Sequence, residues 1–381
     1  MSTVLRHATI YTGLEKIEDG YIRFGKTIEA VGPMSEYKAQ PEDDIHFVGE
    51  QIIVPGFIDV HTHGGYGFDA MDGDADQINE MVNDVVLNEG VTSIFCTTMT
   101  QSNENIEKAM RGVAAAAERN PVIQGVHLEG PFISTKYKGA QPEEYIKDPN
   151  VDLLARWNEL SGNRVRLITI APEHEGADEF EAYCLAHNIV PSVGHSDATR
   201  AQLLNSKVTH TTHLYNAQRE FKHREPGVTG HAMLEDNIYA ELIVDGFHIV
   251  PDMLKLAYEI KGPERIDLVT DSMRAKGVAE GTSELGGQTV YVKDKQARLE
   301  DGTLAGSVLA FDDAFRNAMR FFGCGIEEVV QMSSVNQARE FGLEQKGTLE
   351  VGKDADINVF DANLKKLDTY SYGRKFVNES K

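Results

Sequence analysis

Residues 55–73 read PGFIDVHTHGGYGFDAMDG. The apolar run before His61 predicts a buried strand, and His61 and His63 stand at its end with one residue between them. Because alternate side chains of a strand point to the same side, the two imidazoles project together. An isolated pair of this kind fits structural hydrogen bonds about as well as it fits a metal ion, so the rest of the chain has to decide.

Short apolar runs with strand character alternate with amphipathic, helix-like segments from residue 52 onward. Eight such runs occur, at 52–63, 92–98, 123–130, 166–173, 188–196, 208–216, 240–249 and 266–272. This alternation predicts a parallel sheet, and eight units close into an α/β fold of the (β/α)8 TIM-barrel type. A doubly wound open sheet is the alternative, but it often has a glycine-rich phosphate turn after its first strand, which is missing here.

The two ends of the chain differ from its middle. Residues 1–51 and 347–381 contain short alternating strands and no strong helix. They predict one small β-sandwich domain built from both ends, with a catalytic barrel over residues 52–346. The helical runs at 311–322 and 326–342 should pack on the barrel.

Composition restricts the possible partners and the compartment. The 381 residues carry a net charge of −23, which disfavours nucleic acid and anionic membranes. Cys96, Cys184 and Cys324 are far apart, so no disulfide framework is expected. The N-terminal residues lack the pattern of a secretion signal, and no apolar run is long enough to span a bilayer. We therefore expect a cytoplasmic protein.

Residues that bind metals gather at the ends of six of the eight predicted strands. They are His61 and His63, Glu129, His195, His213, Asp245 with His248, and Asp271. Active sites of such barrels form where the strands end, and imidazole with carboxylate suits Zn²⁺, Fe²⁺ and related ions. Each residue alone is more often a structural hydrogen-bonding group. Their coincidence on one rim predicts a catalytic metal site.

Eight motifs carry a resemblance to a known family. They are PGFIDVHTHG (55–64), GVHLEGPF (125–132), VGHSDAT (193–199), THLYNA (212–217), REPGVTG (224–230), DGFHI (245–249), VTDSM (269–273) and GTLAGS (302–307). Over nearly its whole length the chain resembles the amidohydrolase superfamily and, within it, the N-acetylglucosamine-6-phosphate deacetylases. The resemblance implies hydrolysis of the acetamide of N-acetyl-D-glucosamine 6-phosphate to D-glucosamine 6-phosphate and acetate.

The resemblance also implies roles for the residues of the rim. Glu129, His195 and His213 hold the principal metal, and Asp271 is the general acid–base. Members of the family differ in whether they keep the histidine pair. This chain keeps His61 and His63, which implies a second metal with Glu129 as the bridge, and thus one or two divalent ions (Zn, Fe, Mn or Co) per subunit.

Substrate contacts follow from the same resemblance. Gln141 stands where some members have a histidine near the substrate carbonyl, and its amide can donate a hydrogen bond but supplies no proton. Arg224, His248 and the backbone N–H groups of Asn216 and Ala217 are expected to bind the phosphate. Family members are typically homodimers whose neighbouring chain contributes to this pocket. The basic residues beside Arg224 are as compatible with a solvated loop as with phosphate binding: Arg219, Lys222 and His223.

Three other functions remain open. A deacetylase for N-acetylgalactosamine 6-phosphate would share every metal ligand, and an N-acyl-amino-acid deacylase is a more distant alternative. A catalytically inactive assembly protein of this fold is the non-enzyme alternative. Such proteins lose metal ligands, and none is missing here.

Overall fold

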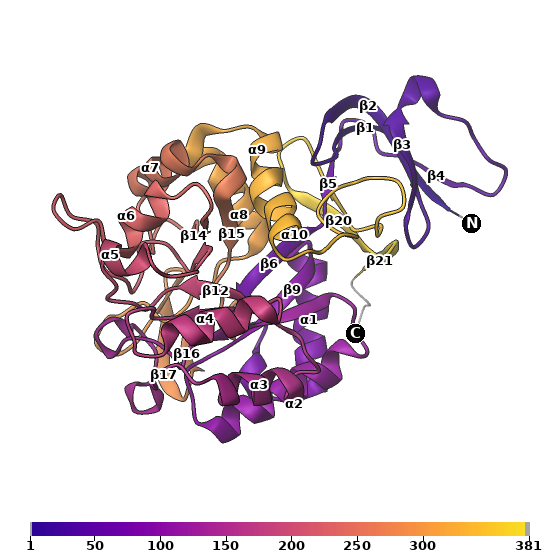
Figure 1. Ribbon diagram of the computed structural model, residues 1–381. Helices are drawn as coiled ribbons and strands as arrows, with labels where there is room; N and C mark the ends of the chain where they lie inside the picture. The colour runs from indigo at the N-terminus through magenta and orange to yellow at the C-terminus, as the bar shows by residue number, and fades with distance from the viewer. Residues whose placement is uncertain (1, 378–381) are drawn as a thin grey trace.

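The eight alternating runs form a parallel barrel. In the computed structural model, which describes residues 2–377, its strands follow one another in chain order (Figure 1). They are β6 (Phe57–Thr62), β9 (Val91–Thr98), β10 (Ile123–Glu129), β11 (Val165–Ile170), β12 (Val190–Val193), β13 (His210–Thr211), β14 (Tyr239–Ile243) and β15 (Ile266–Val269). The first and last strands are joined by hydrogen bonds beyond β15, where Asp271 N–H donates to His61 O at 2.8 Å and His63 N–H donates to Ser272 O at 2.9 Å. The predicted (β/α)8 barrel is confirmed.

Helices connect the barrel strands and cover the outside of the barrel (Figure 1). The α-helices are α1 (Ala75–Glu89), α2 (Asn103–Ala117), α3 (Val151–Leu160), α4 (Ala177–Ala186), α5 (Arg200–Leu203), α6 (Gly227–Leu234), α7 (Pro251–Lys261), α8 (Phe311–Ala318), α9 (Ile326–Val330) and α10 (Asn336–Glu340). Short 3₁₀ turns are η1 (Met34–Glu36), η2 (Ala70–Asp72), η3 (Thr135–Tyr137), η4 (Glu143–Tyr145) and η5 (Pro263–Arg265), and π turns are η6 (Met319–Gly323) and η7 (Gln331–Val335).

Local signals explain where these helices begin and end. The Asp74 carboxylate accepts from the N–H groups of Asp76 and Gln77 and caps α1. Gly90 ends the same helix at a φ of 81°, and a Cβ there would collide with the Asn358 amide. That amide donates to Gly90 O at 2.8 Å, so the end of α1 is tied to the small domain.

Strands from both chain ends lie in one eight-stranded sheet, which fits the expected small β-domain shared by the two ends. Its strands run in the order β21 (Arg374–Phe376), β20 (Lys366–Ser371), β19 (Ile357–Phe360), β5 (Ile52–Pro55), β1 (Thr3–Tyr11), β2 (Lys16–Phe24) and β3 (Ile28–Pro33), with β4 (Asp44–Phe47) also paired to β1. Figure 1 shows the indigo N-terminal strands beside the yellow C-terminal ones. The domain limits at 51/52 and 346/347 stay predictions.

The single strand expected over residues 52–63 is wrong, because two strands of different sheets occupy this range. β5 pairs antiparallel with β19, and β6 begins at Phe57 in the barrel. The chain passes from one sheet to the other at Gly56, where a side chain would collide with Thr92. Apolar character alone could not reveal this break, since both strands are buried.

A three-stranded antiparallel sheet that the sequence analysis did not predict follows β15. Its strands are β16 (Gly281–Leu285), β17 (Gln288–Lys293) and β18 (Gln296–Arg298). Their buried side chains, among them Leu285 and Val290, pack against Met99 and Met273 near the strand ends of the barrel. A two-stranded ribbon, β7 (Gly64–Gly65) with β8 (Phe68–Asp69), follows β6.

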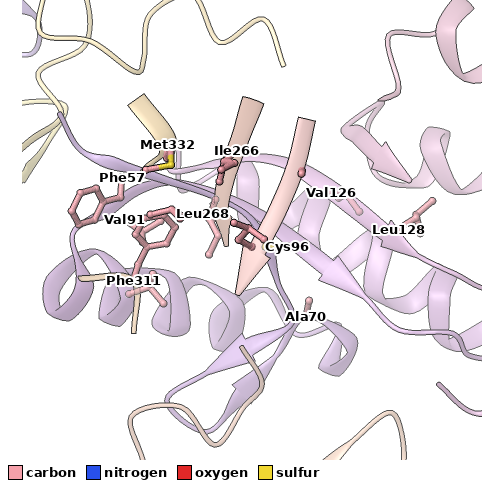
Figure 2. Packing of buried hydrophobic residues seen from close by; sticks show 14 of the residues in the cluster. Phe57, Ala70, Val91, Cys96, Val126, Leu128, Ile266, Leu268, Phe311 and Met332 are labelled. Atoms are coloured by element: carbon pink, nitrogen blue, oxygen red, sulfur yellow. The ribbon is translucent and has the colours of Figure 1, made fainter. Parts of the chain in front are cut away.

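Apolar side chains fill the layer between the barrel strands and the helices around them. The Phe57 ring stacks on Phe311 and on Phe315, with centroids 5.1 Å apart in each pair. Figure 2 shows Phe57 and Phe311 beside Val91 and Met332 in the largest hydrophobic cluster. The helical runs 311–322 and 326–342 thus pack on the barrel as predicted.

The part of the chain that the structure describes has no helix with the length and apolar composition needed to cross a bilayer. Cys96 and Cys184 are buried, Cys324 is half-buried, and all three are free thiols.

Candidate metal centre and active site

Glu129, the last residue of β10, is at the centre of a buried cluster of imidazoles. Its Oε1 atom lies 3.0 Å from His213 Nε2 and 3.2 Å from His195 Nε2, and these two nitrogens are 3.1 Å apart. The three side chains come from the ends of β10, β12 and β13. Each offers one ligand atom within 4.8 Å of the others, so the group can hold one metal ion.

A second group of ligand atoms adjoins the first. Asp271 Oδ1 lies 3.3 Å from His61 Nε2 and 3.2 Å from His63 Nε2. The second oxygen of Glu129, Oε2, lies 3.2 Å from His63 Nε2. Glu129 thus faces both groups, which is the geometry that a bridging carboxylate needs.

Three of these residues have a left-handed backbone conformation directly after a barrel strand. The φ angles are 47° at His195, 30° at His213 and 46° at Asp271. Residues other than glycine rarely adopt positive φ, and such strain collects at functional sites. The turns bring side chains from three different strands into one cluster. With an extended backbone at these positions, the same side chains would lie along the barrel wall.

The charges of the cluster favour a cation. Burial opposes the charged form of His61, but the carboxylates of Asp271, Glu241 and Glu129 outweigh it and raise the pKa of His61 to about 9. Burial likewise opposes the Glu129 carboxylate, yet the surrounding imidazoles hold its pKa well below the usual range. The site therefore keeps ionised carboxylates that need positive charge nearby.

A divalent metal fits these residues. His61 Nε2 is buried between Glu129 and Asp271, and within residues 2–377 it has no hydrogen-bond partner. An unpartnered buried nitrogen among carboxylates is costly unless a cation or a proton meets it. The nitrogen and oxygen donor set is the one that Zn²⁺ and related ions take.

Two contacts hold the ligands in place. Gln141 Nε2 donates to Glu129 Oε2 at 2.6 Å, while its own Oε1 accepts from Thr100 N–H at 2.8 Å. His195 Nδ1 lies 2.8 Å from Tyr137 O, which turns its Nε2 toward Glu129. Gln141 thus lies beside the candidate metal ligands, on a loop about a dozen residues after Glu129.

A cavity of about 340 Å³ opens above the cluster. Its lining contains most of the residues predicted for metal, catalysis and substrate: His63, Glu129, Gln141, His195, His213, Asn216, Ala217, His248 and Asp271. His61 is fully buried behind them. Arg224 is exposed and does not line this cavity.

The cavity wall holds candidates for anion binding. His248 Nδ1 lies 2.6 Å from Asp245 Oδ2, which fixes the imidazole at the wall. The Asn216 N–H already donates to His213 O at 2.9 Å. In contrast, the Ala217 N–H, at a φ of 46°, has no hydrogen-bond partner within residues 2–377.

Sequence reasoning missed several lining residues. Met99, Leu285, Thr303 and Leu304 line the cavity. Lys136 also lines it, with its ammonium 2.8 Å from Asp197. Thr303 and Leu304 belong to the GTLAGS motif, so that motif was a usable signal. Leu285 comes from the unpredicted sheet after β15.

Comparisons with known proteins show the family of the chain. The model of the amidohydrolase family matches residues 52–379. The chain is 37% identical to an N-acetylglucosamine-6-phosphate deacetylase of Bacillus subtilis, over 98% of this chain and 96% of the relative. It is 31% identical to an N-acetylgalactosamine-6-phosphate deacetylase of Escherichia coli O157:H7, over 96% of each chain.

A solved structure is similar over the whole fold. It is a point variant of N-acetyl-D-glucosamine-6-phosphate deacetylase from Mycobacterium smegmatis in complex with N-acetyl-D-glucosamine-6-phosphate. The TM-score is 0.93 at 30% identity, with 99% of this chain and 100% of that chain covered. The resemblance stated from the motifs is confirmed, and the chain belongs to the amidohydrolase family.

Proposed function

We propose that the protein hydrolyses the acetamide of N-acetyl-D-glucosamine 6-phosphate and releases D-glucosamine 6-phosphate and acetate. The observation that carries the proposal is the meeting of Glu129, His195 and His213 with Asp271 at one cavity. The named relatives support the choice of substrate.

The metal would be a divalent ion of Zn, Fe, Mn or Co, with one or two per subunit. Glu129, His195 and His213 would hold the first ion, and His61 and His63 the second, with Glu129 between them. When bound, such an ion supplies a Lewis acid that polarises an amide carbonyl and lowers the pKa of water from about 16 toward roughly 7.

Asp271 is proposed to move the proton. Burial raises the pKa of its carboxyl group, but His61 and His63 outweigh burial and lower this pKa below its usual value. The carboxylate is therefore ionised at neutral pH, as a general base must be. It takes a proton from the attacking water and returns it to the departing nitrogen. Gln141 cannot share this task, because an amide does not transfer protons.

The phosphate is proposed to bind at the wall formed by His248, Asn216 and Ala217. The unpartnered Ala217 N–H supports this placement. Arg224 is exposed and does not line the cavity of its own chain. We therefore propose a homodimer in which Arg224 of the partner subunit reaches the phosphate.

The three free thiols fit the reducing cytoplasm, which we propose as the location of the protein.

The proposal is tested by acetate release from four sugars: the N-acetyl forms of glucosamine and galactosamine, each with and without the 6-phosphate. Metal content is measured on the same sample. We expect the highest kcat/KM for N-acetyl-D-glucosamine 6-phosphate. Preference for the galactosamine phosphate would support the second candidate, which the Escherichia coli relative represents. No acetate from any sugar by the metal-loaded enzyme would contradict both.

Arg224→Ala should weaken kcat/KM for the 6-phosphate roughly ten- to several-hundredfold and leave the unphosphorylated sugar nearly unchanged. A hydrogen bond to a charged group contributes about 1.5–3 kcal/mol, and each 1.4 kcal/mol is about tenfold in affinity. Arg224→Lys should recover part of the loss, because an ammonium keeps the charge without the planar fork.

Lys222→Ala is the matched control for Arg224. It removes one positive charge from the same exposed loop, where Lys222 pairs with Glu220 at 3.2 Å, and should change neither activity. Equal losses on phosphorylated and unphosphorylated sugar in Arg224→Ala would mean that Arg224 supports the fold or the dimer.

A further inference from the structure

Glu241, a fully buried carboxylate of β14, lies beneath the metal centre and has no part in the reaction described above. Its Oε2 atom lies 2.8 Å from His61 Nδ1 and accepts from His213 N–H at 2.9 Å. Its Oε1 atom lies 3.1 Å from His210 Nε2. Three neighbours thus occupy both oxygens, and two of them are candidate metal ligands.

The contact with Glu241 decides which nitrogen of His61 faces the cavity. An ionised carboxylate only accepts hydrogen bonds, so His61 Nδ1 carries the proton. In the neutral imidazole, which is the form that binds a metal, the lone pair is then on Nε2, which lies 3.5 Å from Glu129 Oε1 and 3.3 Å from Asp271 Oδ1. A hydrogen bond on the far nitrogen fixes both the tautomer and the orientation of a metal-binding imidazole.

His63 lacks such support. Its Nδ1 atom is buried without a hydrogen-bond partner in the described part of the chain. Only one histidine of the pair is therefore oriented by a carboxylate, and the second ligand group depends on Glu241 through His61.

A second histidine holds Glu241 from below. His210 lies between two carboxylates, with Nε2 3.1 Å from Glu241 Oε1 and Nδ1 3.0 Å from Glu340 Oε1. His210 is fully buried, so the carboxylate of Glu241 has no freedom to turn away from His61. A chain of contacts thus leads from Glu340 through His210 and Glu241 to His61, which is one of the candidate metal ligands.

We propose that Glu241 is the positioning residue of the second metal ion, because it holds His61 with Nε2 turned toward Glu129 and Asp271. The inference rests on the proposed function, since it takes the cavity to be a metal centre. It predicts that the affinity for the second ion depends on Glu241, whose side chain neither binds metal nor touches substrate.

The test compares metal binding in Glu241→Ala, Glu241→Met and Glu241→Gln. Alanine accepts no hydrogen bond and methionine only a weak one, so both variants should weaken binding of the second ion about 10- to 100-fold. Binding of the first ion should weaken much less, because His213 loses a partner only for its backbone N–H. Glutamine can place its oxygen at the position of Oε2, and its NH₂ group then faces His210. It should give an affinity between wild type and Glu241→Ala. Stoichiometry and affinity are measured by titrating the metal-free protein with Zn²⁺.

Thermal unfolding separates a metal-positioning role from a purely structural one, because only the former changes the Zn²⁺-induced rise in Tm. A bound ion raises Tm according to its concentration and dissociation constant. Glu241→Ala should show a smaller Zn²⁺-induced rise in Tm than wild type, close to that of His61→Ala. Glu181→Gln is the matched control. Glu181 is a buried carboxylate on α4, away from the site, and it accepts hydrogen bonds from Ser206 Oγ and Lys207 N–H at 2.6 Å each. It should lower Tm with and without Zn²⁺ by the same amount.

Loss of the second equivalent in Glu241→Ala and Glu241→Met, with partial recovery in Glu241→Gln, would support the proposal. Should the alanine variant not fold, the methionine and glutamine variants decide. Retention of both ions at wild-type affinity, or only one ion in wild type, would overturn it. Acetate release by wild type is judged separately: its absence would contradict the proposed function, whatever the metal titrations show.

Discussion

Replacing Asp271 with asparagine should lower kcat by about 10²- to 10⁴-fold, the usual contribution of a general acid–base group. Asparagine keeps the shape of the side chain but cannot accept a proton from water. KM for N-acetyl-D-glucosamine 6-phosphate should change much less than kcat, because the proposed phosphate contacts lie elsewhere on the wall. Steady-state acetate release by the metal-loaded variant measures both constants.

Asp252→Asn is the control for the lost charge. It removes one carboxylate from the exposed first turn of α7 and should keep wild-type kinetics. An Asp271→Asn enzyme with more than a tenth of the wild-type kcat would exclude Asp271 as the proton carrier.

Glu129→Gln should remove bound metal and lower kcat by on the order of 10³-fold or more. Glu129 faces His195 and His213 with one oxygen and His63 with the other, so both ligand groups lose their shared carboxylate. The metal contributes several kcal/mol of transition-state stabilisation, and about 1.4 kcal/mol is tenfold in rate. Metal analysis and kcat on one preparation make the measurement.

Chelation should reproduce this loss in wild type, and added Zn²⁺, Fe²⁺, Mn²⁺ or Co²⁺ should restore activity to wild type but not to Glu129→Gln. The double variant with alanine at His61 and His63 is compared with Glu129→Gln. It should lose about one metal equivalent and keep part of the activity. Full activity of a metal-free wild-type preparation would contradict metal dependence altogether.

Much of the barrel could be predicted from the sequence because its signals are local. Each strand is a short apolar run between amphipathic segments, and each run lies where the structure has a strand. The break at Gly56 was missed because β5 and β6 are both buried and read as one run. The sheet of β16, β17 and β18 was missed although Gly286 and Gly287, between two alternating segments, are a typical hairpin signal.

The residues of the candidate site were likewise predicted only in part. Residue type and position at strand ends predicted His61, His63, His195, His213 and Asp271, because parallel strands bring their carboxyl ends to one rim. Glu241 carried no such signal. It lies within an apolar strand, and only the closed barrel shows that its carboxylate meets His61. The exposed position of Arg224 also became visible only in the folded chain.

The sequence by itself predicted the fold class from periodicity and a metal site from the residue types at the strand ends, and it indicated the family through the resemblance of eight motifs. The tertiary structure alone decided which oxygen of Glu129 faces which imidazole, how Glu241 orients His61, and that the sheet after β15 forms part of the cavity wall. These features depend on distances between residues up to about two hundred positions apart. Such distances are set when the barrel closes and its strands pack.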